Sequence, residues 1–243
     1  MNNKDKTELI LTLSCPDTSG IVAEVAGFMA EQKLTIKESN QFGDSETDSF
    51  FMRVKALSIS NNDNIDISDI RKDFEVIAQK RQMQFNVYNT SIIPKIIIMV
   101  SKFDHCLVDL LYRVKTGELK AEIAAIISNH SDTEELAKSY NIPFHLIKVN
   151  SENKKNAEKS LKSLVSKYNA EAIILARYMQ ILSKEISDKY NSKIINIHHS
   201  FLPSFKGASP YKQAYKRGVK LIGATAHFVT SDLDEGPIIE QDV

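Results

Sequence analysis

The chain has 243 residues, 42% of them hydrophobic and 26% charged, and its 31 basic residues balance its 31 acidic residues. This balance argues against a general nucleic-acid-binding surface, which would show a basic excess. No apolar run approaches the ~18 residues that span a bilayer, and the N-terminus has no apolar segment of a secretory signal, so we expect a cytoplasmic protein. The two cysteines, Cys15 and Cys106, are far apart and indicate neither a disulfide framework nor a zinc site.

The first third of the chain, residues 1–88, is expected to form a ferredoxin-like βαββαβ domain. Apolar residues alternate where strands are predicted and recur every three or four positions where helices are predicted. The predicted elements are a strand over 8–15, a helix over 16–32, a hairpin over 34–57, a helix over 67–82 and a strand over 83–89.

Within this domain, the segment CPDTSGIVAEVAGFMAEQKLTIKESNQF (15–42) resembles an ACT domain, a regulatory module that commonly binds amino acids. The resemblance implies an effector site at a helix N-terminus, where free N–H groups can bind a carboxylate, and a homo-oligomer, because such domains often pair edge to edge. The implied effector-binding residues are Asp17, Thr18, Gly20, Ile21 and Asn40. In the alternative interpretation, the first two only cap the helix and the glycine only permits the turn.

A linker over 89–94 leads to a second expected domain over 95–243, in which strand and helix patterns alternate. This alternation predicts a Rossmann-like, mostly parallel α/β structure. The predicted strands cover 95–101, 121–128, 144–149, 172–176 and 193–198, and one of the predicted helices covers 179–190. The lysine-rich helix predicted over 153–169 is interpreted as a solvated face rather than a nucleic-acid surface, because acidic residues interleave with the lysines of 154–167 and no aromatic platform accompanies them.

Three polar residues near the end of the chain suggest acyl-transfer chemistry. Asn196 and His198 lie two apart on a predicted strand and therefore share a face. The turn-like segment SDLDEGP (231–237) can bring Asp234 to the same strand end. An amide that stabilises an oxyanion, an imidazole that transfers a proton and a carboxylate that orients water suit acyl transfer.

The motifs VSKFDHCLVDLLYR, ILARYMQILS, NIHHSFLPSFKGASPY and HFVTSDLDEGPIIEQ resemble the formyltransferase-type domain of folate enzymes, which includes glycinamide ribonucleotide transformylases and formyltetrahydrofolate deformylases. The resemblance implies 10-formyltetrahydrofolate as the formyl donor, no metal and no further cofactor. It implies Asn196, His198 and Asp234 as catalytic residues, with His199 and His227 beside them. The implied folate-binding residues are Met179, Gln180, Ile181, Leu182, Thr230, Ser231, Asp232 and Leu233.

The segment SKFDH (101–105) separates transferase from hydrolase chemistry. A transformylase needs a glycine-rich loop here to cradle a nucleotide phosphate with backbone N–H groups, whereas this segment has no glycine and Asp104 adds negative charge. Water then remains as the nucleophile. The ACT-like half and the second histidine of the pair His198–His199 also resemble formyltetrahydrofolate deformylases.

We therefore predict hydrolysis of 10-formyltetrahydrofolate to formate and tetrahydrofolate, which would supply formate for purine synthesis. The alternatives are formyl transfer to an amine acceptor and a catalytically inactive amino-acid sensor. The family usually continues beyond PIIEQDV (237–243) with a further segment, so the chain is expected to be incomplete at its C-terminus.

Overall fold

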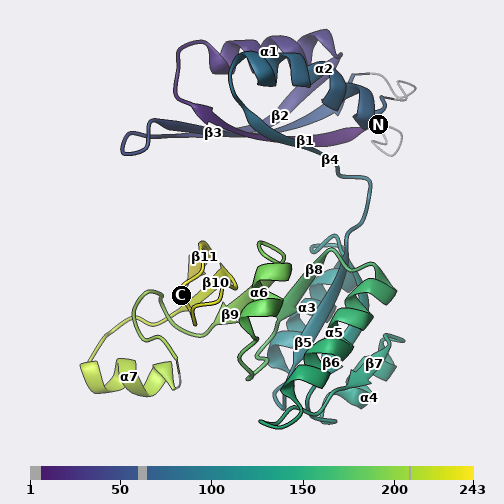
Figure 1. Cartoon of the computed structure of the whole chain (residues 1–243), viewed down its shortest axis with the longest axis vertical. Helices are drawn as coiled ribbons and strands as arrows, with labels where there is room; N and C mark the ends of the chain where they lie inside the picture. The colour runs from purple at the N-terminus through teal and green to yellow at the C-terminus, as the bar shows by residue number, and fades with distance from the viewer. Residues whose placement is uncertain (1–6, 60–64, 208) are drawn as a thin grey trace. The chain divides into compact units, whose positions relative to one another are not determined.

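The computed structural model describes residues 7–59, 65–207 and 209–243. The chain divides into two compact units, Met1–Ile92 and Ile93–Val243, each described by itself below (Figure 1). The first six residues, where no signal segment is expected, lie outside the described part. In the part that is described, no helix is both long and apolar enough to cross a membrane.

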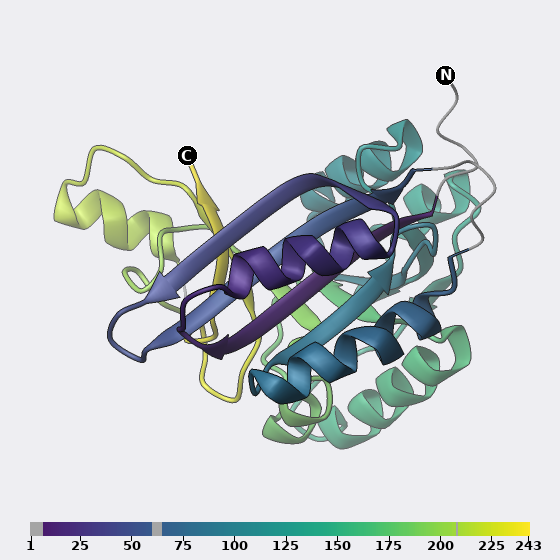
Figure 2. The ribbon, with the colours of Figure 1, turned by 90° about the horizontal axis from the view of Figure 1, so that it is seen from above.

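The N-terminal unit is a four-stranded antiparallel sheet with two helices on one face (Figure 2). Its elements are β1 (Glu8–Pro16), α1 (Ile21–Glu31), β2 (Leu34–Asp44), β3 (Ser49–Ser58), α2 (Ile67–Lys80) and β4 (Gln84–Asn89). The strand order is β2-β3-β1-β4, with every pair antiparallel. This arrangement confirms the predicted ferredoxin-like order.

The alternation of apolar residues along β1 explains how this unit closes its core. Leu9, Leu11 and Leu13 point to the helix side and are buried, while the residues between them are partly exposed. Phe74 of α2 is fully buried, with its ring centroid 5.1 Å from that of Phe28 of α1. Burial of each such side chain contributes about 1.5–3 kcal/mol. The core therefore ties both helices to one face of the sheet.

The C-terminal unit is a seven-stranded sheet of order β11-β10-β9-β8-β5-β6-β7. Its elements are β5 (Lys95–Val100), α3 (His105–Thr116), β6 (Glu122–Ser128), α4 (Glu134–Ser139), β7 (Phe144–Leu146), α5 (Lys154–Tyr168), β8 (Ala172–Leu175), α6 (Lys184–Lys189), β9 (Ile194–His198), α7 (Pro210–Arg217), β10 (Ala224–Phe228) and β11 (Ile238–Asp242). The five strands from β7 to β9 in this order are parallel to one another. β10 pairs antiparallel with β9, and β11 pairs antiparallel with β10 at the edge of the sheet. The mostly parallel α/β fold is thus confirmed.

Helices cover both faces of the parallel part of this sheet. Ile97 and Met99 of β5 pack with residues of α5 and α6, whereas Ile96 and Ile98 pack with residues of α3 and α4. The chain leaves β5 toward β6 on one side and returns to β8 on the other. Strand order therefore reverses beside β5, and the crevice at the carboxyl ends of such strands is where ligands bind in open α/β sheets.

Two predicted elements differ from the structure. The helix predicted over 179–190 begins only at Lys184, because Arg177 adopts a left-handed backbone with φ 58° and Ser183 caps α6 by accepting a hydrogen bond from the Ile186 N–H. The strand predicted over 144–149 is paired only over Phe144–Leu146. The first difference matters for function, since it leaves residues 176–183 as a loop at the strand ends.

Candidate active site

A cavity of about 300 Å³ lies at the carboxyl ends of β8 and β9. The loops after β8 and β10 supply most of its wall. All thirteen residues predicted as catalytic, as their neighbours or as folate-binding line this one cavity: Met179, Gln180, Ile181, Leu182, Asn196, His198, His199, His227, Thr230, Ser231, Asp232, Leu233 and Asp234. The structure thus brings together three segments of the chain, 179–182, 196–199 and 227–234.

Asn196 is oriented by a histidine of the neighbouring strand. Asn196 of β9 lies opposite His227 of β10, and its Nδ2 is 3.1 Å from the imidazole Nε2. The other ring nitrogen, Nδ1, is 2.9 Å from the Phe228 carbonyl oxygen and must donate to it. The neutral ring therefore accepts a hydrogen bond from the amide. Burial lowers the pKa of His227 and keeps this neutral form.

Both ring nitrogens of His198 face oxygen acceptors. Its Nε2 is 3.1 Å from the carbonyl oxygen of Phe205, and its Nδ1 is 3.5 Å from Oδ2 of Asp234. The side chains of His198 and Asp234 are only 5% and 7% exposed. A protonated imidazole can donate to both acceptors at once, so the geometry suits a histidine that holds and releases a proton beside a carboxylate.

Asp234 occupies the centre of the polar cluster. Its Oδ2 accepts a hydrogen bond of 2.9 Å from the Gly207 N–H, and its Oδ1 is 3.8 Å from Nε2 of His227. Its backbone is left-handed, with φ 57°, a conformation that costs about 1–3 kcal/mol for a residue other than glycine. Strain of this kind persists where the surrounding structure fixes a side chain in place.

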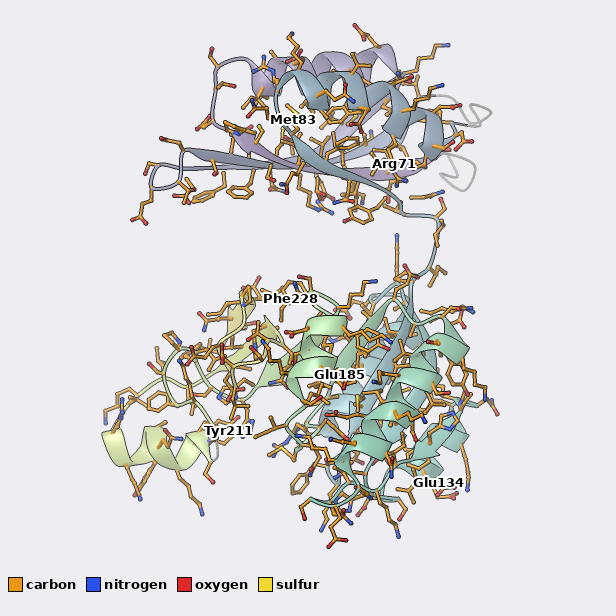
Figure 3. The ribbon with its side chains drawn as sticks, viewed as in Figure 1. Arg71, Met83, Glu134, Glu185, Tyr211 and Phe228 are labelled. Carbon is orange, nitrogen blue, oxygen red and sulfur yellow. The ribbon has the colours of Figure 1, made fainter. Side chains whose placement is uncertain are left out.

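The turn that carries Asp234 depends on a close approach at Gly236. A Cβ atom added there would lie 1.7 Å from the carbonyl oxygen of Phe228 at the end of β10. Phe228 is labelled in Figure 3, on the strand that precedes this turn. Only glycine therefore allows the chain to turn back beside β10 and present the carboxylate.

His199 lies beside the cluster without joining its hydrogen bonds. Its ring centroid is 5.6 Å from that of His198 and 5.2 Å from that of Tyr211 in the first turn of α7. Tyr211 is labelled in Figure 3. Burial lowers the pKa of His199, and the nearby charge of Arg177 lowers it further. Despite these histidines, the described residues include no group of three His, Cys, Asp or Glu side chains that could hold a metal ion.

The predicted folate-binding residues form two loops of the cavity wall. Met179, Ile181 and Leu233 have 57%, 61% and 50% of their surface exposed, which is unusual for apolar side chains lining one cavity. Clustered exposed apolar surface of this kind marks a place where a ligand binds. The loop from β8 is fixed at its base, since Ser101 accepts a hydrogen bond of 3.1 Å from the Met179 N–H.

Several residues of the site were not predicted from sequence. Ser101 also donates to Asn129 at 2.7 Å, which links the loops after β5, β6 and β8. Arg177, Tyr178 and Gly207 line the cavity as well. Arg177 and Tyr178 lie inside the motif ILARYMQILS, so the motif indicated their region, but no local pattern indicated that they face the cavity.

The predicted effector-binding residues lie at the turn between β1 and α1, apart from Asn40 on β2. Asp17, Thr18, Gly20 and Asn40 are exposed, whereas the side chain of Ile21 is buried in the core, so only its backbone can contact a ligand. Gly20 has φ 86°, a conformation that favours glycine.

An arginine from the end of α2 closes this turn. The guanidinium of Arg81 donates to Glu24, to Thr18 Oγ1 at 3.1 Å and to the Ser19 carbonyl at 3.1 Å. A Cβ atom at Gly20 would lie 3.3 Å from its Nη2. The first turn of α1 thus has a fixed cation beside its free N–H groups.

Comparison with known proteins places this chain among folate enzymes. A formyl transferase family model matches residues 94–243. The formyltetrahydrofolate deformylase of Corynebacterium sp. strain P-1 is 46% identical over 234 residues, which cover 96% of this chain and 81% of that protein. The Bacillus subtilis deformylase is 46% identical over 242 residues, which cover 99% of this chain and 79% of the relative.

Solved structures of deformylases are also similar to this chain. A formyltetrahydrofolate deformylase from Pseudomonas syringae superposes with a TM-score of 0.90 at 41% identity, covering 98% of this chain and 78% of that one. A phosphoribosylglycinamide formyltransferase from Anaplasma phagocytophilum matches only 62% of this chain and 71% of its own, with a TM-score of 0.56 at 33% identity. Because the deformylases match nearly the whole chain, the chain belongs to the formyltetrahydrofolate deformylase family.

Proposed function

We propose that this protein hydrolyses 10-formyltetrahydrofolate to formate and tetrahydrofolate at the cavity beside β9, with Asn196, His198 and Asp234 as its catalytic residues. The observation that carries the proposal is the convergence of these three side chains on one cavity, with His198 Nδ1 3.5 Å from Asp234 Oδ2. The activity is the one for which the relatives are named.

Asn196 stabilises the negative charge that forms on the formyl oxygen. One of its two amide N–H bonds is directed to His227, which fixes the plane of the amide, and the second can donate to the substrate. A donor of this kind typically contributes about 3 kcal/mol to transition-state stabilisation. The His227 ring therefore acts as a positioning residue for the amide.

Asp234 and His198 move the protons of the reaction. Water attacks the formyl carbon and transfers a proton to the Asp234 carboxylate. When the bond between that carbon and N10 of the folate breaks, His198 donates a proton to N10 and formic acid forms. Formic acid releases its proton to solvent to become formate, the proton on Asp234 restores the protonated His198, and formate and tetrahydrofolate leave. The hydrogen bond from the Gly207 N–H holds the carboxylate in place for this step. Proton transfer by positioned side chains contributes roughly a hundred- to ten-thousand-fold in rate.

The pterin ring of the substrate fits between the loops 179–182 and 230–233. Exposed backbone groups of loops can pair with the alternating donors and acceptors of a pterin edge. The exposed side chains of Met179, Ile181 and Leu233 then cover the ring faces. Burial of this apolar surface contributes about 25 cal/mol per Å².

The loop after β5 favours water over a nucleotide amine as the acceptor. It consists of Ser101, Lys102, Phe103 and Asp104, without the glycines that let backbone N–H groups reach a phosphate. The Phe103 side chain is 58% exposed, and the guanidinium carbon of Arg177 lies 5.1 Å from its ring centroid. The side chains of Phe103 and Arg177 therefore occupy the place where a phosphate-binding loop would need accessible backbone N–H groups.

A direct assay separates hydrolase from transferase. The purified protein is incubated with 10-formyltetrahydrofolate alone, and formate is measured with a formate dehydrogenase assay. Formate release without any amine supports the proposal. Turnover only after addition of an amine such as glycinamide ribonucleotide refutes it in favour of a formyltransferase. An amino-acid sensor without catalytic activity would show no turnover under either condition.

The domain roles form part of the same proposal. Residues 1–88 serve as an ACT-like regulatory domain, 89–94 as a linker and 95–243 as the catalytic domain of a cytoplasmic enzyme that supplies formate for purine synthesis. The exposed first turn of α1, with Arg81 beside it, supports an amino-acid effector site. The long edge strand β2, exposed along most of its length, supports pairing between copies.

The effector part of this proposal has its own test. Isothermal titration calorimetry with glycine and with methionine, together with rates measured in their presence, reports binding and its effect. Binding that the variant Arg81→Met removes supports the site at α1. No heat and no rate change with any amino acid would reduce this domain to an assembly element.

A further inference from the structure

One cation of the cavity has no counter-ion. Arg177 follows β8, lines the cavity and is half-buried. Among the described residues, its guanidinium forms no hydrogen bond or ion pair, and its Nε is shut off from solvent without an acceptor. The contact that the side chain does make is with the ring of Phe103, whose centroid is 5.1 Å from the guanidinium carbon.

Two arginines outside the cavity are paired with acidic side chains. Arg81 donates to Glu24, Thr18 and Ser19, and Arg113 donates to Asp109 and Glu118. A buried charge without a partner is costly, and buried polar atoms are rarely left without an acceptor. The half-buried guanidinium of Arg177, without such a partner, therefore contrasts with those of Arg81 and Arg113.

The backbone at this residue is also left-handed. Arg177 adopts φ 58°, a conformation that strains residues other than glycine. Among the described residues that line the cavity, Arg177 shares this feature with Asp234, and strain of this kind can hold a side chain for binding or catalysis. It is independent of the missing counter-ion, and both observations concern a residue that lines the cavity.

Arg177 itself makes this end of the cavity cationic. Its charge reaches His199, which stacks beside His198, and it reaches Cys106, where burial raises the thiol pKa and the arginine offsets part of that rise.

The acidic groups nearby are already engaged or exposed. Asp234 is bonded to the Gly207 N–H and faces His198, and Asp109 pairs with Arg113. Asp104 is an exposed residue preceding α3. None of these carboxylates neutralises Arg177.

We propose that Arg177 is a carboxylate-binding residue that receives the product formate as it leaves the catalytic residues, an inference that rests on the proposed function. Formate is a planar anion with two equivalent oxygens, which match the donor pairs of a guanidinium. It forms beside Asp234, and once the proton taken from water has left that carboxyl group, its negative charge repels formate. Arg177 attracts it away from that carboxylate, toward the end of the cavity where His199 lies.

A folate also carries carboxylates on its glutamate tail, and the experiment separates these two sources. Sodium formate is titrated into the full-length protein without folate, and binding is followed by calorimetry. Loss of a charge-assisted hydrogen bond weakens binding about ten-fold or more. We expect that loss in Arg177→Gln and partial retention in Arg177→Lys. The control Arg113→Gln, which removes an exposed arginine of α3 outside the cavity, should bind formate like the wild type.

A second readout uses the wild-type protein alone. Bound formate would neutralise Arg177, raise the pKa of Cys106 and slow alkylation of that thiol, whereas sodium chloride at the same ionic strength would not. Cys15, buried in the other unit, is the internal reference. This measurement keeps the proposal falsifiable if the glutamine variant does not fold.

Two outcomes overturn the proposal. The first is equal formate affinity in Arg177→Gln and wild type, with no protection of Cys106. The second is unchanged formate binding by Arg177→Gln together with a higher KM of this variant for 10-formyltetrahydrofolate, but not for an analogue that lacks the glutamate. That result would assign Arg177 to binding of the glutamate tail. Absence of hydrolysis by the wild type refutes the proposed function separately, because formate titration does not depend on turnover.

Discussion

At the scale of single residues, Asp234 holds the site together, because both its oxygens face polar neighbours from other segments. Asp234→Asn keeps the shape but removes the charge that accepts a proton from water. We expect kcat to fall by roughly a hundred-fold or more, with folate affinity within a few-fold of wild type by fluorescence titration. Turnover close to that of the wild type would remove Asp234 from its assigned role.

Asn196 gives a second prediction at this scale. Asn196→Ala should lower kcat/KM by about a hundred- to a thousand-fold, because the donor to the developing oxyanion is lost. The matched control is Asn191→Ala, an exposed asparagine outside the cavity. Steady-state kinetics of the two variants compares them directly. A similar small effect in both would show that the Asn196 amide does not contact the reacting oxygen.

We predict that the buried His227 makes the free energy of unfolding depend on pH. Burial lowers its pKa in the folded state below the ordinary value of 6.5. The unfolded chain therefore takes up a proton first as the pH falls below that value, and the free energy of unfolding decreases until the folded state is also protonated. His199 and His145 act in the same direction, since burial lowers their pKa values too.

Urea denaturation between about pH 7.5 and pH 5 measures this dependence. His227→Gln should lose less stability than the wild type over this range, whereas His130→Gln serves as the control outside the cavity. An identical loss in the wild type and in His227→Gln would contradict the burial of a neutral imidazole beside Asn196.

At the scale of elements, the turn between β10 and β11 sets the position of the carboxylate. Gly236→Ala places a Cβ atom 1.7 Å from the Phe228 carbonyl, so the turn must move. We expect a destabilisation of about 1–3 kcal/mol and a loss of activity greater than that of stability. The control is Gly27→Ala in α1, where a Cβ atom meets nothing within 4 Å. Full activity of Gly236→Ala would show that the turn can move without displacing Asp234.

The elements also show what sequence patterns can and cannot predict. The strands β5 and β6 are nearly continuous apolar runs, and their burial on both faces follows from that composition. The helix predicted over 179–190 is present but starts later than predicted. Its first residues have an amphipathic pattern, while the left-handed backbone of Arg177 and the Ser183 cap delay the helix to Lys184.

Within the site, some placements could be predicted from the sequence and others could not. The predicted placement of Asn196 and His198 followed from their spacing on one strand, and the family resemblance indicated Asp234. The contacts of Arg177 with Phe103 and of Ser101 with Asn129 join loops distant in sequence. No local pattern can indicate such pairs, because the order of strands in the sheet creates them.

At the scale of the whole molecule, the two units have separate hydrophobic cores. Phe74→Ala removes a fully buried ring from the N-terminal core and should cost that unit about 3–5 kcal/mol. Differential scanning calorimetry should then show an early transition, while folate affinity below that transition stays near the wild-type value. A loss of folate binding at low temperature would show that the cavity depends on the N-terminal core.

Identifying the nucleophile by isotope labelling tests the central claim most directly. The wild-type protein is given 10-formyltetrahydrofolate in oxygen-18-labelled water without any amine, and formate is analysed by mass spectrometry after a single turnover. We expect one labelled oxygen in each formate and almost no formate from Asp234→Asn. Formate without label, or labelled formate formed equally fast by the asparagine variant, would contradict direct attack by water at the cavity of Asn196, His198 and Asp234.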